Sequence, residues 1–211
     1  MMGYYRIFRG VITLVSTPWN KFRLKINGAS YGPHFHSCGS IALAVLSGKL
    51  NIGKNVYINS HPMADPIGGQ SKTIIQLSGG NICIGNRVGI SNTAICSASS
   101  VIIEDDVCIG AGCKIYDTDF HSSIAEYRQN GNINIKTAPV RIKQRAFIGG
   151  HSIVRKGVTI GKESVIGAGS VVICDIPDGE IWAGNPARFL KKVDGAAVID
   201  RQERVMEAVE D

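Results

Sequence analysis

Histidine is the side chain best suited to accept and return a proton near neutral pH. The chain has five of them: His34, His36, His61, His121 and His151. His121 is the strongest candidate because it ends the segment Tyr116-Asp117-Thr118-Asp119-Phe120-His121. Asp117 or Asp119 could accept a hydrogen bond from one ring nitrogen and thereby fix the tautomer. The segment alone is also typical of a solvated loop histidine beside two turn aspartates, so the surrounding elements must decide between the two interpretations.

A six-residue period shows which elements surround His121. Between residues 142 and 176 an aliphatic residue occupies every sixth position: Ile142, Ile148, Val154, Ile160, Ile166 and Val172. A period of six is neither helical nor a simple strand alternation. It fits a short strand plus a corner, with three strands closing a triangular coil and stacked coils sharing one apolar core. Gly149, Gly161 and Gly167 follow the aliphatic residue, where glycine eases the corner.

The same period recurs upstream and is interrupted once. Ile52 and Ile58 share one frame, Ile84 and Ile90 share another, and a further run of Ile103, Ile109 and Ile115 is one residue out of phase with Ile84. Residues 117–139 break the repeat: they are polar, contain Asn130-Gly131-Asn132, and the frame resumes at Ile142. A polar excursion from a regular coil is where binding residues concentrate, which favours the catalytic interpretation of His121.

Composition supports an all-β chain with short strands and excludes some classes of function. The 25 glycines and the many β-branched residues favour strands and tight corners over helices. The net charge of +6 comes without a basic face of interleaved aromatics, so we expect no nucleic-acid partner. It suits an anionic ligand such as a nucleotide or coenzyme. The six cysteines form no C-x-x-C pair, which indicates free thiols, no metal site and a reducing, cytoplasmic location.

Four segments of the chain resemble the hexapeptide-repeat acyltransferases. They are Ile148-Gly149-Gly150-His151, Val158-Thr159-Ile160-Gly161, the run from Val165 to Val172, and Ala183-Gly184-Asn185-Pro186-Ala187-Arg188. The resemblance covers residues 50–193, and the maltose and galactoside O-acetyltransferases and related polysaccharide-modifying enzymes are the most similar branch. It implies a left-handed parallel β-helix of hexapeptide repeats, a homotrimer, and active sites between neighbouring subunits that use acetyl-CoA. The handedness comes from the resemblance alone, because the general crossover rule points the other way.

The resemblance also implies roles for single residues. His121 lies where family members carry the catalytic base, on the extruded loop. Gly150 corresponds to a residue beside the thioester, whose backbone N–H faces the acyl group, and Ala168 to one whose backbone meets the pantetheine arm. Arg188 and Lys191 belong to a basic cluster suited to the phosphates of coenzyme A. His151 is expected to be a corner residue.

The acceptor side is defined less sharply. Asn92, in Ser91-Asn92-Thr93, is expected within one or two coils of His121, where it could bind a sugar hydroxyl; a structural corner asparagine is the alternative. Asp119 is the second candidate for the substrate side. Two residues depart from the family pattern: Phe147 stands where a tryptophan is common, and Cys174 where a lysine is common. They weaken a detailed map of coenzyme contacts.

The two ends of the chain differ from the repeat. Residues 1–49 are predicted to form a short amphipathic helix followed by degenerate coils, residues 50–182 the β-helix with its extruded loop at 117–139, and residues 183–211 a coenzyme-capping turn and a tail. The last eighteen residues are predicted to be a surface helix or a mobile segment. No segment approaches the roughly 20 apolar residues that a bilayer crossing needs, although the first helix leaves peripheral membrane contact open.

Three alternatives remain open at this point. The same fold and base could acetylate the nitrogen of an amino sugar. A γ-type carbonic anhydrase shares the coil but needs three histidines on one zinc ion, and His121 has no histidine partner nearby in the sequence. A non-catalytic scaffold would need neither the loop histidine nor the Gly-Asn-Pro-Ala-Arg segment.

Overall fold

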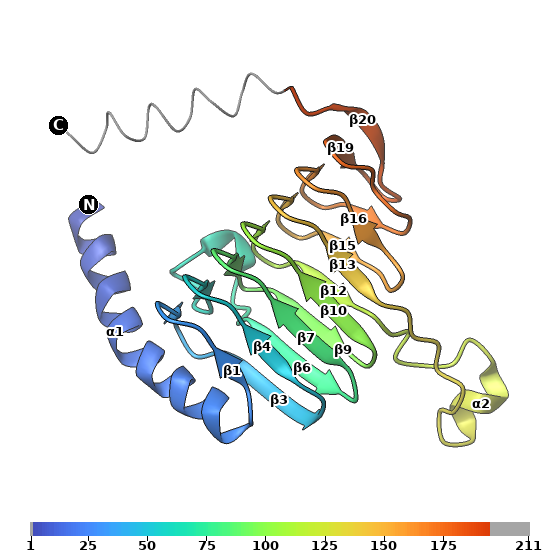
Figure 1. The fold of residues 1–211 in the computed structure, drawn as a ribbon, viewed down its shortest axis with the longest axis horizontal. Helices are drawn as coiled ribbons and strands as arrows, with labels where there is room; N and C mark the ends of the chain where they lie inside the picture. Colours follow the sequence, from blue (N-terminus) through green and yellow to red (C-terminus); the bar gives the residue numbers. More distant parts are fainter. Residues whose placement is uncertain (1, 195–211) are drawn as a thin grey trace.

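The structure is a computed structural model that describes residues 2–194 of the 211-residue chain. Its body is a triangular parallel β-helix in which three flat sheets meet at three corners (Figure 1). The first sheet contains β1 (Ser30–Tyr31), β4 (Leu50–Ile52), β7 (Asn81–Ile84), β10 (Ser100–Ile103), β13 (Val140–Ile142) and β16 (Thr159–Ile160).

The other two sheets follow the same order along the stack. The second contains β2 (His36–Cys38), β5 (Tyr57–Asn59), β8 (Gly89–Ser91), β11 (Cys108–Ile109), β14 (Phe147–Ile148), β17 (Val165–Ile166), β19 (Glu180–Ala183) and β20 (Arg188–Lys192). The third contains β3 (Ala42–Ser47), β6 (Ile74–Ser78), β9 (Ala94–Ser97), β12 (Lys114–Tyr116), β15 (Ile153–Val154) and β18 (Val171–Val172). From β1 to β18, consecutive strands therefore belong to successive sheets, and each coil pairs with the next in parallel.

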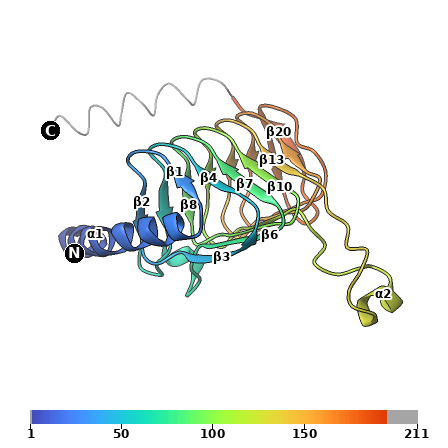
Figure 2. The same cartoon turned by 60° about the horizontal axis from the view of Figure 1, so that its bottom comes forward.

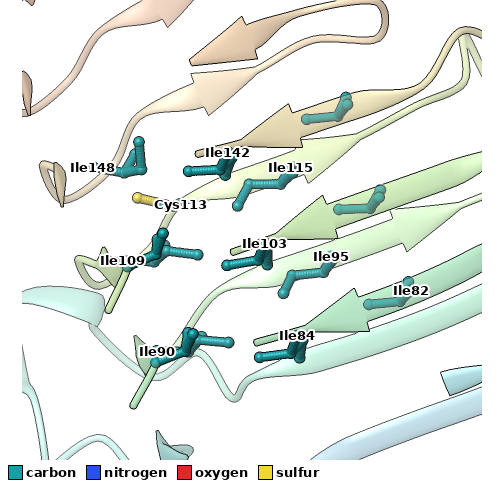
Figure 3. Close-up of a cluster of buried hydrophobic side chains, with 14 of the residues drawn as sticks. Ile82, Ile84, Ile90, Ile95, Ile103, Ile109, Cys113, Ile115, Ile142 and Ile148 are labelled. Carbon is teal, nitrogen blue, oxygen red and sulfur yellow. The ribbon is translucent and has the colours of Figure 1, made fainter. Parts of the chain in front are cut away.

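The six-residue period produces three buried columns of aliphatic side chains, one per sheet (Figure 3). The strand register aligns Ile84 with Ile103, Ile142 and Ile160; Ile90 with Ile109, Ile148 and Ile166; and Ile95 with Ile115, Val154 and Val172. Between Ile142 and Ile160 one coil takes 160 − 142 = 18 residues, or three hexapeptides. Between Ile84 and Ile103 it takes 103 − 84 = 19, which explains the one-residue slip.

The N-terminal region differs from the predicted short helix and degenerate coils. α1 (Met2–Ile26) is 25 residues long, and β1, β2 and β3 form an ordered first coil ahead of the predicted boundary at residue 50. The aliphatic frame fails there because Ser37 is in register with the buried Ile58. The Ser37 hydroxyl instead accepts a hydrogen bond from Asn20 of α1 at 2.8 Å. A polar contact with the capping helix thus replaces the aliphatic contact that the repeat would supply.

Along α1, polar side chains face the first coil and cap its open end. Ser16, Thr17 and Asn20 are buried and bind backbone groups between Ser37 and Ile41. Within residues 2–194 no helix combines the length and apolarity that a membrane crossing requires.

Residues 117–139 leave the third corner of the coil, after β12, and return at β13; they carry α2 (Ala125–Gln129) and project away from the stack (Figure 2). The excursion begins as a short antiparallel ladder, in which Thr118 pairs with Thr137 and the Asp119 N–H donates to the Lys136 carbonyl at 3.0 Å. A 3-10 turn, η1 (Pro66–Gly68), lies in a second loop between β5 and β6. At the far end, β19 and β20 form an antiparallel hairpin. The predicted C-terminal helix or mobile tail falls on residues 195–211, outside the described residues.

Candidate functional site

His121 lies at the start of the excursion with its side chain exposed. Its ring contacts Asn132 of the same loop, whose Nδ2 lies 3.0 Å from His121 Nδ1. Two further hydrogen bonds fix the orientation of the Asn132 amide: Oδ1 accepts from the Ser122 N–H, and Nδ2 donates to the Phe120 carbonyl at 2.9 Å. Asn132 therefore donates to His121 Nδ1, and the neutral ring carries its own proton on Nε2.

Neither aspartate of the segment contacts the His121 ring as a partner, because both carboxylates bind elsewhere. Asp117 is fully buried and accepts hydrogen bonds from the Ser97 hydroxyl and from the N–H groups of Ala98 and Ser99, at 2.7 to 2.9 Å. Asp119 forms an ion pair with Lys156 at 3.3 Å. The two carboxylates thus anchor the excursion to the coils on either side of it.

Asn92, Gly150 and Ala168 lie along one corner of the stack, between the second and third sheets. Backbone hydrogen bonds connect successive layers of this corner: Gly112 N–H to the Asn92 carbonyl, His151 N–H to the Ala111 carbonyl, and Gly169 N–H to the Gly150 carbonyl. We call this set of turns (residues 91–93, 110–112, 149–151 and 167–169) the glycine corner. Among the hydrogen bonds of the described residues, none takes the N–H of Gly150 or Ala168 as donor.

The basic residues expected to meet coenzyme phosphates lie at the end of the glycine corner. The turn 184–187 forms its next layer, because the Gly184 carbonyl accepts from the Val171 N–H and the Val171 carbonyl from the Ala187 N–H. Arg188 and Lys191 follow in β20, both exposed. Lys191 pairs with Asp194 at 3.2 Å. The corner therefore offers free backbone donors in its middle and cations at one end.

The loop between β5 and β6 covers the other end of the glycine corner. The His151 ring hydrogen-bonds through Nε2 to the Ile67 carbonyl at 2.7 Å, and His151 itself has a φ of 60°, as a corner residue should. Gly68 lies so close to Asn92 that an added Cβ would come within 2.5 Å of its Nδ2.

The loop between β5 and β6 therefore confines the Asn92 side chain. It has a φ of 41° and is 2% exposed. Its Nδ2 donates to the Asp65 carbonyl at 3.1 Å, while its Oδ1 is buried without a partner among the described residues. The conformation is that of a corner asparagine, and one strong acceptor atom remains unused.

A cavity of about 250 Å³ lies at the base of the excursion. Its lining includes Cys96, Ser97, Thr118, Phe120 and Thr137. Phe120, which precedes His121, is half-exposed and packs against Tyr116 with ring centroids 5.5 Å apart.

Within one chain the two halves of the site are separated. His121 belongs to the corner between the third and first sheets, whereas Gly150 and Ala168 belong to the corner between the second and third. Asn92 lies in the coil next to that of β12, as expected. It belongs, however, to the glycine corner and not to the corner that carries His121. No three His, Cys, Asp or Glu side chains gather into a metal-binding group anywhere in residues 2–194.

Sequence reasoning missed Asn132 and the loop around Ile67. Asn132 was recognised only as part of a polar Asn-Gly-Asn turn, since nothing in the spacing connects it to a histidine eleven residues away. The loop interrupts the hexapeptide frame with Pro62 and Pro66, and that interruption was the available signal.

Comparison with known proteins agrees with this architecture. Residues 139–174 match the family model described as the hexapeptide repeat of succinyl-transferase. The chain is 38% identical to the galactoside O-acetyltransferase of Escherichia coli over 116 residues, which are 54% of this chain and 56% of that protein. It is 42% identical to the Saccharomyces cerevisiae protein YJL218W over 117 residues, 54% of this chain and 58% of that protein. The chain thus spans little more than half the length of the curated relatives it matches.

The solved structures confirm the fold. The D94A mutant of AntD, an N-acyltransferase from Bacillus cereus in complex with dTDP and coenzyme A, superposes with a TM-score of 0.65 at 24% identity, covering 88% of this chain and 95% of that one. The hexapeptide-repeat acetyltransferase VCA0836 of Vibrio cholerae gives 0.55 at 21% identity, covering 90% and 85%. The predicted class, an all-β left-handed parallel β-helix, is confirmed.

Proposed function

We propose that this hexapeptide-repeat protein is an acetyl-CoA-dependent O-acetyltransferase that acts on a hydroxyl of a sugar or glycan precursor. The single observation that carries the proposal is the glycine corner. Its unused N–H donors at Gly150 and Ala168 lead to the exposed cations Arg188 and Lys191, an arrangement that suits an extended anionic coenzyme. The sequence relationship to a galactoside O-acetyltransferase supports a sugar hydroxyl as the acceptor.

The separation of His121 from the glycine corner supports a site shared between subunits of a homotrimer. A base on one subunit's excursion and a coenzyme groove on its neighbour would complete each other, and each closed ring would hold three equivalent sites. Asn92, at the covered end of the groove, and Asp119, at the base of the excursion, are the proposed contacts of the acceptor. The unused Asn92 Oδ1 would accept a hydrogen bond from an acceptor hydroxyl once the loop over it shifts.

In the proposed reaction His121 removes the proton of the acceptor hydroxyl, and the oxygen attacks the acetyl carbon of the thioester. The Gly150 N–H donates to the oxyanion that forms. Collapse of this intermediate breaks the C–S bond, and the imidazolium returns the proton to the sulfur, so that coenzyme A leaves as the thiol. Acceptance of the proton at Nε2 requires the proton of the neutral ring to be on Nδ1, so Asn132 must release Nδ1 when the site assembles.

The first test is thiol release from acetyl-CoA with a panel of sugar acceptors. We expect acceptor-dependent release that falls by roughly a hundredfold or more in His121→Ala. His36→Ala is the matched control, because His36 is also exposed but lies on β2 of the first coil. Release that persists in His121→Ala would remove the base assignment, and no release with any acceptor would remove the proposed activity.

A mixed-subunit experiment tests the shared site. His121→Ala lacks the base, and Ala168→Trp should block the groove at an exposed position. Neither variant should turn over alone, whereas random mixed trimers should regain about a quarter of the wild-type rate, because one in four interfaces pairs an intact base with an intact groove. Mixed samples as inactive as the single variants would place base and groove in the same subunit.

N-acylation of an amino sugar is the second candidate. The observation in its favour is the fold likeness to the N-acyltransferase AntD. Amino sugars in the same acceptor panel distinguish the two, since the O-acetylated product is an ester, which mild alkaline hydroxylamine cleaves, and an amide is stable to it.

A further inference from the structure

The face of α1 that points away from the β-helix is apolar. Eight large side chains lie exposed on it: Ile7, Phe8, Val11, Leu14, Val15, Trp19, Phe22 and Ile26. Leu14 is 76% exposed and Val15 69%. Spacings of three and four residues place all eight within an arc of about 140° at 100° per residue. They form one stripe, interrupted by the exposed Pro18 and Lys25, which we call the outer face of α1.

The orientation of this helix is fixed from its inner side. Ser16, Thr17 and Asn20 are buried against the first coil, and Asn20 alone makes hydrogen bonds to Ser37, Gly39 and Ile41. Because the inner side of α1 uses these polar side chains together with the buried Leu24, the other large apolar side chains of the helix face outward. The exposed stripe is therefore a consequence of the fold, and it is larger than the scattered apolar residues usual on a surface.

Charge is distributed unevenly along the chain, and the excess lies at the α1 end. Residues 1–64 contain seven Lys and Arg (Arg6, Arg9, Lys21, Arg23, Lys25, Lys49, Lys54) and no Asp or Glu. The remaining residues hold 23 − 7 = 16 basic and 17 acidic side chains, a balance of −1. Residues 1–64 thus carry a formal charge of +7, and the rest of the sequence carries −1.

We propose that the outer face of α1 is a docking surface for an anionic lipid bilayer. An amphipathic helix with aromatic and aliphatic residues on one face and no acidic residue is the kind that lies in the plane of such a surface. Lys25 is exposed within this face and Lys21 lies at its border, whereas Arg9 and Arg23 bind Asn59 and the Ile41 carbonyl of the coils. Helix α1 is too polar to cross the membrane, and its inner face remains bound to the first coil. The β-helix would then stand on the membrane by its N-terminal end.

The loop between β5 and β6 extends the same surface. The Phe8 ring contacts His61 edge-on, with centroids 5.9 Å apart. Two further side chains of this loop, Met63 and Ile67, are 52% and 68% exposed. The loop that covers Asn92 therefore lies beside the docking face, and this proposal stands independently of the proposed acetyl transfer.

The test is binding of the full chain to vesicles of phosphatidylcholine with 30% phosphatidylglycerol (about a third anionic lipid), compared with phosphatidylcholine alone. We expect the anionic vesicles to bind most of the protein, roughly tenfold more than the neutral ones, and 0.5 M NaCl (a Debye length of about 4 Å) to release most of it. Leu14→Glu should lower the bound fraction at least tenfold. Ile173→Glu is the matched control: it makes the same charge change at an exposed isoleucine just after β18, at the other end of the stack.

A fluorescence readout locates the contact. Trp19 is exposed on the outer face, and the only other tryptophan is Trp182 in β19. Brominated lipid should quench the wild type, and Trp19→Phe should bind equally but show little quenching. Equal binding of Leu14→Glu and wild type, or quenching that survives in Trp19→Phe, would overturn the proposal. The proposal would also fail if the wild type bound neither kind of vesicle and Leu14→Glu changed the sedimentation mass of the protein. The outer face of α1 would then join copies of the chain.

Discussion

At the scale of single residues, the contact between Asn132 and His121 controls what the imidazole can do. Its geometry is set by three hydrogen bonds, of which two orient the amide and the third reaches the ring. An amide donor at Nδ1 leaves Nε2–H as the outward group, which can donate but cannot accept. Tautomer choice by a neighbouring group is a general means of switching a histidine between these two states.

We therefore predict opposite effects for two substitutions at this position. Asn132→Asp replaces the donor by an acceptor, so the neutral His121 ring should carry its proton on Nδ1 and keep its activity at or above the wild-type level. Asn132→Ala also removes the hydrogen bonds to the Ser122 N–H and the Phe120 carbonyl that shape the loop around His121, so the base loses its position and turnover should fall roughly tenfold or more. Nitrogen-15 NMR of the imidazole reports the tautomer directly. An unchanged tautomer in Asn132→Asp would contradict this account of the ring.

The thiol of Cys113 offers a second prediction at this scale. Burial raises the pKa of Cys113 to about 11, and its Sγ lies 3.2 Å from the Gly149 carbonyl. At pH 8 roughly 0.1% of such a thiol is ionised, against roughly a quarter of an ordinary one. We expect iodoacetamide to label the exposed Cys83 and Cys174 in the folded protein and Cys113 only after unfolding, as mass spectrometry would show. Labelling of Cys113 as fast as Cys83 would mean that the corner opens readily.

His121 itself could be found from the sequence because it stands where a regular repeat stops. Its partner could not, because Asn132 reaches it through an irregular loop whose path no periodicity encodes. The same holds for Asn92: its role as a substrate contact stays a prediction, and its burial depends on Gly68, which comes from a loop 24 residues earlier.

At the scale of elements, the excursion is rigid at its base. Asp117 is the anchor: it is fully buried and accepts three hydrogen bonds from the corner at Ser97, Ala98 and Ser99. The antiparallel ladder begins at the next residue. His121 therefore extends from a fixed stem and not from a freely moving loop.

Removal of the anchor should loosen both the fold and the site. Asp117→Ala leaves the N–H groups of Ala98 and Ser99 without an acceptor and the Ser97 hydroxyl with only the Asn81 carbonyl, and we expect it to lower the free energy of unfolding by roughly 2–4 kcal/mol. Urea unfolding measures this, and turnover should fall as well because His121 loses its stem. Glu126→Ala, on the exposed surface of α2 in the same excursion, should change stability by less than about 0.5 kcal/mol. Equal effects of the two substitutions would contradict the role given to Asp117.

The hexapeptide period predicted the coils well where aliphatic columns form the core, from Ile84 to Val172. It failed for the first coil, where Ser37 takes an inward position and the helix supplies its partner. A sequence period reveals contacts between equivalent residues of successive coils. It cannot reveal a contact between a coil and a helix outside the repeat.

At the scale of the whole molecule, the two ends of the stack are closed differently. At one end α1 binds the backbone of the first coil through side chains, including Ser16 to the Ser37 carbonyl at 2.6 Å and Asn20 to the Gly39 carbonyl at 2.9 Å. At the other end the second sheet finishes with the antiparallel strand β20. Figure 1 shows α1 and β20 at opposite ends of the coil stack.

A variant that lacks residues 1–28 should test this closure. The backbone groups that α1 satisfies would become an open parallel edge, which is a template for pairing with another chain. We expect the shortened protein to form higher assemblies that grow with concentration, as light scattering and electron microscopy would show, while the full chain keeps one size. A shortened protein of unchanged size at all concentrations would mean that the first coil closes itself.

The serine, threonine and asparagine side chains on the inner face of α1 thus have a role in limiting growth. Each coil of a parallel β-helix is a copy of the surface on which the next coil forms, so nothing in the repeat specifies a length. Polymer chemistry meets the same difficulty and solves it with a chain stopper, a unit that bonds to the growing end and offers no new one. By binding the backbone between Ser37 and Ile41, α1 closes the first edge of the second sheet, and a sequence whose local pattern would equally well describe a filament forms a finite particle.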